Sequence, residues 1–118
     1  RLMIDAAVQP AGATAELALD LARIAPFGAG NLEPRFVLPA ARVAKADVVG
    51  ENHVRCFLTG ESGGRLKAIS FRSLGEPHGD AILNSNGMPL HIAGHIRVDR
   101  WQGREEAQLI IEDVAAVQ

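Results

Sequence analysis

The chain has 118 residues, 47% of them hydrophobic, which is enough for one ordinary core but not for two full domains. Its net charge of −2 excludes the domain-wide basic excess typical of proteins built to neutralise phosphates, so a nucleic-acid surface could only be a local patch. A single cysteine, Cys56, excludes an internal disulfide, and no apolar run approaches the roughly 20 residues that cross a bilayer. These features predict a cytoplasmic protein without a membrane partner, in which Cys56 is an inert core thiol.

The first residues suggest the end of a preceding domain. The chain starts at Arg1 without an initiator methionine, and Leu2–Asp5 resembles the last strand of a preceding domain. We therefore expect a fragment of a larger protein.

A helix is predicted from Thr14 to Ile24, where Leu17 and Leu21 recur at helical spacing. Thr14 is a suitable N-cap, and Pro26 prevents the helix from continuing.

The next segment, PFGAGN, has two interpretations. Its glycines could turn backbone amides toward a phosphate, or they could supply backbone angles for a turn that a phenylalanine pins to the core. Phosphate loops are followed at once by a helix, whereas a strand-like run follows here, so the structural interpretation is preferred. The turn residues are Pro26, Phe27, Gly28, Gly30 and Asn31.

From Phe36 onward the hydrophobic period is that of β-strands. Leu90–Val98 alternates as a half-buried strand, and Phe36–Val49 is long, with a break at Pro39–Arg42 that predicts a bulge and a strand shared by two sheets. A hairpin is expected from Asn52–Leu58 and Arg65–Phe71.

A short helix near Asp80–Leu83 and a last strand at Glu105–Val114 complete the order of a mainly β fold, a five-stranded OB-fold barrel preceded by a linker helix. The expected organisation is the end of a preceding domain or linker at 1–12, the linker helix at 13–25, the connecting turn at 26–35 and the barrel at 36–118.

Several stretches resemble the C-terminal barrel of the RecJ family, bacterial single-strand-specific DNA exonucleases. They are PFGAGN with Glu33–Phe36, Asn52–Arg55, Lys67–Phe71, Trp101–Arg104 and Gln108–Asp113. The resemblance covers nearly the whole chain, although Leu32 stands where the family often has proline. It implies single-stranded DNA, the catalytic core of the same chain and a single-strand-binding protein as partners. The family's Asp-His-His motif has no counterpart in these residues, so the fragment itself is expected to have no nuclease activity and no cofactor, and the divalent Mn or Mg belongs to the missing core.

Candidate DNA-binding residues follow from the faces that an OB-fold exposes. Arg55 and Phe57 share a strand face with His53, and outward placement would pair a cation with a ring. The alternative is an inverted strand with Phe57 in the core. Arg65 and Lys67 are weaker candidates, because they face outward only if Ile69 does so too.

Trp101 lies in the loop of the last hairpin, between Arg100 and Arg104, and Arg72 completes the basic patch. Trp101 could stack on a base, or it could pack over the end of the barrel.

A metal site is not expected. His91 and His95 share a strand face but are separated by roughly 13 Å at about 3.3 Å per residue. A second hypothesis for the whole chain remains open, in which the domain packs on the catalytic core or docks an accessory protein; the acidic charge and the scarcity of aromatic residues favour it.

Overall fold

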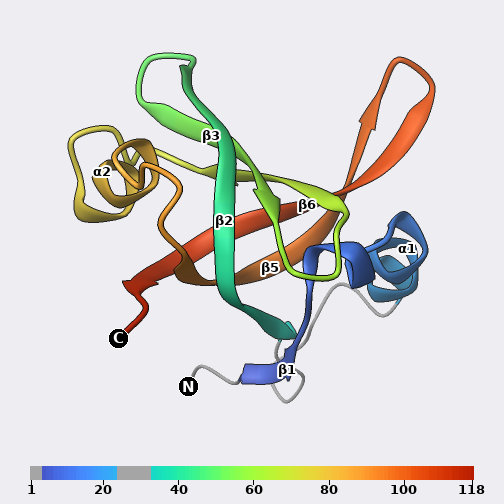
Figure 1. The fold of residues 1–118 in the computed structure, drawn as a ribbon. Coiled ribbons are helices and arrows are strands. Elements are labelled where there is room, and N and C mark those ends of the chain that lie inside the picture. Colours follow the sequence, from blue (N-terminus) through green and yellow to red (C-terminus); the bar gives the residue numbers. More distant parts are fainter. Residues whose placement is uncertain (1–3, 24–32) are drawn as a thin grey trace.

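A computed structural model describes residues 4–23 and 33–118 and places them in a twisted barrel with helices at its ends (Figure 1). The elements in chain order are β1 (Ile4–Ala7), the 3-10 helix η1 (Pro10–Gly12), α1 (Ala15–Arg23), β2 (Arg35–Val49), β3 (His53–Thr59), β4 (Arg65–Ser70), α2 (Pro77–Leu83), β5 (Leu90–Trp101) and β6 (Arg104–Ala116). The PFGAGN turn and the expected helix end at Ile24 lie outside the described residues.

The sheet closes on itself. The strand order is β1-β2-β3-β4-β6-β5, and an additional pairing of β2 with β5 completes a ring of strands β2 to β6. Neighbours in the ring are antiparallel except β4 and β6, which are parallel. This confirms the five-stranded OB-fold barrel.

The break in β2 lets one strand serve both sides of the barrel, as the sequence predicted. The register shifts between Leu38 and Ala41; the part before the shift pairs with β5 and the last part with β3. Pro39 has no N–H to give to the ladder, and Ala40 adopts a φ of 52°. The Ala40 N–H donates instead to Nδ1 of His91 at 3.1 Å.

The core consists of inward side chains from every strand of the ring. Those at 0–1% exposure include Leu38, Val54, Cys56, Leu58, Leu66, Ala68, Ile92 and Leu109. The half-buried strand predicted at Leu90–Val98 is confirmed, since residues 90, 92, 94 and 96 are buried and those between them are not.

Helices cover two regions of the barrel. α1 packs on β5 and β6, and the N–H of Leu17 donates to Oγ1 of Thr14 at 3.2 Å, which confirms Thr14 as the N-cap. α2, also predicted, packs on β2 and β3. No helix among residues 4–23 and 33–118 is long and apolar enough to cross a membrane.

The N-terminal residues lie on the barrel. β1 pairs in parallel with the start of β2, and η1 contacts the loop between β3 and β4. The contact is close: a Cβ at Gly60 would lie 2.9 Å from Cδ of Pro10, and one at Gly64 2.8 Å from Cα of Ala11. Glycine at these two loop positions is therefore what lets η1 approach.

Candidate nucleic-acid interface

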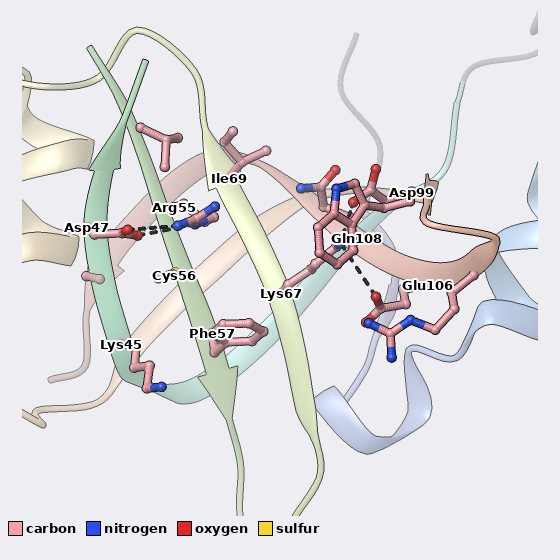
Figure 2. Close-up of a pocket in the computed structure, with 14 residues that line it drawn as sticks. Lys45, Asp47, Arg55, Cys56, Phe57, Lys67, Ile69, Asp99, Glu106 and Gln108 are labelled. Carbon is pink, nitrogen blue, oxygen red and sulfur yellow. Dashed lines mark hydrogen bonds and ion pairs between the residues drawn. The ribbon is translucent and has the colours of Figure 1, made fainter. Parts of the chain in front are cut away.

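The outer face of the β3–β4 hairpin is the floor of a groove with a volume of about 870 Å³ (Figure 2). β2 forms one wall, and the β5–β6 hairpin, which extends away from the barrel in Figure 1, forms the other. The lining residues are Lys45, Ala46, Asp47 and Val49 of β2, Arg55, Cys56 and Phe57 of β3, Lys67 and Ile69 of β4, Asp99 and Trp101 of β5, and Arg104, Glu106 and Gln108 of β6.

Strand alternation determines which side chains reach the floor. In β3 the buried residues are 54, 56 and 58, so Arg55 and Phe57 face outward. Phe57 is only half-buried, which rules out the alternative in which it belongs to the core. In β4 the buried residues are 66, 68 and 70, so Arg65, Lys67 and Ile69 are also outward.

Strand register then aligns four of the side chains that line the groove in one row. Lys45 pairs with Phe57, Phe57 with Lys67, and Lys67 with Gln108. Directly opposed residues of antiparallel strands have Cβ atoms about 4.5–5.5 Å apart, which makes the row continuous from Lys45 to Lys67, and the parallel β4–β6 pairing adds Gln108 at its end. The guanidinium of Arg65 lies 4.1 Å from the centroid of the Phe57 ring, a cation–π contact at the edge of this row. Cations thus surround an aromatic ring on the groove floor.

Two of the groove cations are held by carboxylates. Arg55 donates through Nε and Nη2 to the two oxygens of Asp47, at 3.2 and 2.8 Å (Figure 2). Lys67 contacts the carboxylate of Asp99, and its Nζ lies 3.9 Å from Glu106.

The other two groove cations, Lys45 and Arg104, are not paired in this way within the described part of the chain. Within residues 4–23 and 33–118, neither Lys45 nor Arg104 forms an ion pair, and both are exposed. Their charges face the solvent in the groove.

Trp101 stands at the tip of the β5–β6 hairpin, opposite Arg104 in the register. Between them Gln102 and Gly103 have φ values of 50° and 75°, as a two-residue hairpin turn with right-handed twist requires. Trp101 is 55% exposed, so it does not pack over the barrel end. Arg100 has the opposite strand parity, does not line the groove, and pairs with Glu105 at 3.0 Å.

His53 and Arg72 form a separate contact beyond the groove. The N–H of Arg72 donates to Nδ1 of His53 at 2.9 Å, and the His53 ring meets Phe71 edge-on at a centroid distance of 5.3 Å. The structure therefore brings together four of the seven predicted binding residues, Arg55, Phe57, Trp101 and Arg104, and leaves His53, Arg72 and Arg100 outside the groove lining.

Cys56 lies beneath the floor, with its side chain 1% exposed. Burial, and secondarily the charge of Asp47, raises the pKa of the Cys56 thiol from 9.0 to about 12. A thiol that stays protonated is a poor nucleophile, so Cys56 serves packing.

The donor set does not fit a metal ion. In the part of the chain that the structure describes, no group of three or more His, Cys, Asp or Glu side chains could hold one.

The sequence pattern does not indicate Lys45, Gln108 or the three groove acids as binding residues, and it indicates Lys67 only weakly. The signal for Lys67 was present in the hairpin: once Val54, Cys56 and Leu58 are taken as inward, their partners Ser70, Ala68 and Leu66 must be inward too. Lys67 then faces the same side as Phe57.

A closed five-stranded barrel with a groove over the face of its second and third ring strands defines an OB-fold domain. The chain matches the RecJ OB domain over residues 4–113, and it belongs to that family. The resemblance noted in the sequence is thereby confirmed.

Two crystal structures of RecJ from Thermus thermophilus have the same fold. The complex with Mn²⁺ gives a TM-score of 0.65 at 21% sequence identity, with 94% of this chain and 15% of that chain covered. The complex with Mg²⁺ gives 0.64 at 21% identity, with 94% and 16% covered. This chain thus corresponds to about 15% of the length of those proteins. No curated protein matches it.

Proposed function

We propose that the domain binds single-stranded DNA in this groove, as the nucleic-acid-binding module of a RecJ-like 5′–3′ single-strand-specific DNA exonuclease in DNA repair and recombination. The observation that carries the proposal is the row across the groove floor, with Phe57 between Lys45 and Lys67. Single strands are bound by charge that follows the backbone and by rings on which bases stack, and this row supplies both.

The hairpin tip extends the same chemistry. Trp101 and Arg104 are cross-strand neighbours at the groove wall, and both are exposed. An indole could stack on a base while the adjacent guanidinium contacts a phosphate.

In the parent enzyme, hydrolysis would belong to a separate catalytic core, since the described residues of this domain contain no metal-ligand cluster. The two Thermus RecJ structures hold Mn²⁺ or Mg²⁺, which supports a divalent metal in the parent enzyme, and we assign it to the catalytic core. The domain would hold the strand that enters that core in the cytoplasm, where a single-strand-binding protein is a further candidate partner.

The direct test is fluorescence anisotropy of a labelled single-stranded oligonucleotide of about 12 nucleotides, a length within the range that an OB-fold covers. A matched duplex serves as the control ligand, at low and at moderate salt. We expect the domain to prefer the single strand, whose bases are free to stack on the groove rings. Binding should weaken as salt rises, because in a domain of net charge −2 the attraction comes only from the local groove cations, which salt screens. Equal affinity for the duplex, or no binding at low salt, would refute the proposal.

A matched pair of variants locates the site. Arg104→Ala removes a groove cation, and Arg23→Ala removes a cation on α1 that is paired with Asp20 at 3.2 Å. Arg104→Ala should weaken binding and reduce the salt slope by about 0.7, the value for one phosphate contact of a single strand. Arg23→Ala should leave both unchanged.

A second candidate function is packing on a catalytic core or docking of an accessory protein. It is favoured by large apolar side chains that are exposed outside the groove, namely Phe71 at 51%, Leu74 at 43% and Met88 at 65%. Charge reversal at Arg55 in the full-length enzyme separates the two candidates. Arg55→Glu should reduce action on single strands if the groove holds DNA, and should leave it unchanged if the domain only packs.

A further inference from the structure

The groove contains acids, which a surface for a polyanion would not be expected to carry. Its lining has four basic side chains, Lys45, Arg55, Lys67 and Arg104, and three acidic ones, Asp47, Asp99 and Glu106. The acids are not scattered: each lies against one of the two central cations. Two of the four basic groups are therefore neutralised in the free domain.

The geometry of the Arg55–Asp47 pair is that of a phosphate contact. The guanidinium presents two parallel N–H groups to the two carboxylate oxygens, at 3.2 and 2.8 Å, and this fork is the arrangement in which arginine also binds phosphate. Asp47 thus occupies the position that a backbone phosphate would take. Both side chains are about half exposed, so an incoming strand can reach the pair.

The Lys67 pair is deeper. The Lys67 side chain is only 16% exposed, and it contacts Asp99 while Glu106 lies 3.9 Å away. A partly buried ammonium needs a counter-ion when no ligand is present. Asp99 comes from β5 and Lys67 from β4, and the two strands are brought near each other by β6, which pairs with both.

We infer that Asp47 and Asp99 are built-in counter-ions that substitute for DNA phosphates in the free groove and limit its affinity for a polyanion. A strand that binds must replace these carboxylates on Arg55 and Lys67. The expected results are an affinity below what the four groove cations would allow and a shallow salt dependence, because part of the exchange is phosphate for carboxylate within the protein. The inference rests on the proposed binding of single-stranded DNA by the same groove.

Three substitutions with the same change of charge test it. Asp47→Asn and Asp99→Asn each remove one counter-ion, and Asp20→Asn removes an acid on α1 that is paired with Arg23 outside the groove. Binding of the labelled single-stranded oligonucleotide is measured by anisotropy over a series of salt concentrations. Thermal unfolding is recorded for each variant, because Asp99→Asn leaves a partly buried lysine with less compensation. Asp47→Asn breaks a half-exposed pair and serves as the variant whose fold is least affected.

We expect each groove variant to bind about 3- to 10-fold more tightly than the wild type at low salt, with the slope of log K against log salt steeper by up to about 0.7 for each cation set free. Asp20→Asn should bind like the wild type, because Asp20 is paired with Arg23 on α1 and holds no cation of the groove.

The outcomes separate the two proposals. If the wild type binds and both groove variants bind equally or more weakly, the counter-ion inference is wrong and the proposed function stands. If neither the wild type nor any variant binds at low salt, the proposed function fails and the inference fails with it. Tighter binding by Asp20→Asn as well would assign the effect to overall charge and overturn the inference.

Discussion

Trp101→Ala offers the sharpest test of the groove, because one side chain contributes ring surface at its edge without being part of the core. Stacking of a base on an aromatic side chain contributes about 1–3 kcal/mol, and about 1.4 kcal/mol corresponds to a tenfold change in Kd. Trp101→Ala should therefore weaken binding of the single strand by about 5- to 150-fold.

The stability cost can be bounded from the exposure of the indole. Trp101 is 55% exposed, so about 100 Å² of its surface is covered in the folded state, given that a buried aromatic covers roughly 150–250 Å². At about 25 cal/mol per Å² the loss is at most about 2.5 kcal/mol. Affinities are measured well below the unfolding transition of the variant, which is recorded in parallel.

The chain has one tryptophan and no tyrosine, so intrinsic fluorescence reports on Trp101 alone. An unlabelled oligonucleotide should quench the emission of the wild type as bases stack on the indole. Trp101→Phe, which keeps a ring, should retain more affinity than Trp101→Ala. Met88→Ala, which removes a side chain that is 65% exposed and outside the groove, should have no effect. Binding by Trp101→Ala within twofold of the wild type, together with unchanged emission at saturation, would refute the stacking role.

Three further predictions concern the barrel itself. Gly94→Ala should lower the free energy of unfolding by about 3 kcal/mol in chemical denaturation, because its Cβ would lie 2.0 Å from the carbonyl oxygen of Ile110, next to the bulge of β6 at Glu112; stability equal to the wild type would contradict this packing. Burial raises the pKa of the Cys56 thiol to about 12 from 9.0, so the stabilisation from keeping it protonated is complete below pH 9 and is lost between pH 9 and 12. Over that window the unfolding equilibrium constant should rise about tenfold per pH unit relative to Cys56→Ala, and parallel curves for the two proteins would argue against the shift. Thr14→Ala should destabilise the fold by about 1 kcal/mol in thermal unfolding by removing the cap on the Leu17 N–H, whereas Thr14→Ser should retain the cap.

Local sequence patterns were sufficient to predict much of the fold. The cap at Thr14 and the alternation from Leu90 follow from the sequence because each depends on neighbours within one element. The bulge in β2 could also be predicted, since Pro39 removes a ladder donor wherever the strand runs.

Local patterns could not predict which face of β4 points into the core. Apolar residues occur at both parities, with Leu66 and Ala68 on one face and Ile69 on the other. The choice depends on the hairpin register, which the β3–β4 loop sets through Gly63 and Gly64 at φ values of 78° and 77°. A loop longer by one residue could exchange the faces of β4 and send Lys67 inward.

The contacts of the groove acids could not be predicted from local patterns either, because they depend on which strands pair. Asp99 meets Lys67 only because β6 pairs in parallel with β4 and antiparallel with β5. Arg55 and Asp47 are opposite each other in the β2–β3 ladder, a pairing that the alternation of β3 alone does not reveal.

The parallel pairing of β4 with β6 also means that the barrel can close only once β6 is available. During synthesis the β2–β3–β4 meander emerges first, with the outer edge of β4 unpaired until residues 108–110 of β6 are available. The β2–β5 pairing likewise joins segments more than fifty residues apart, since Phe36 is opposite Gly94. Closing such long loops is slow, and an open strand edge is a template for aggregation in the meantime. A ribosome-bound or truncated chain that ends before β6 should therefore be an open sheet with an unpaired edge that is prone to aggregation. The thirteen residues of β6, Arg104–Ala116, convert this sheet into a closed barrel.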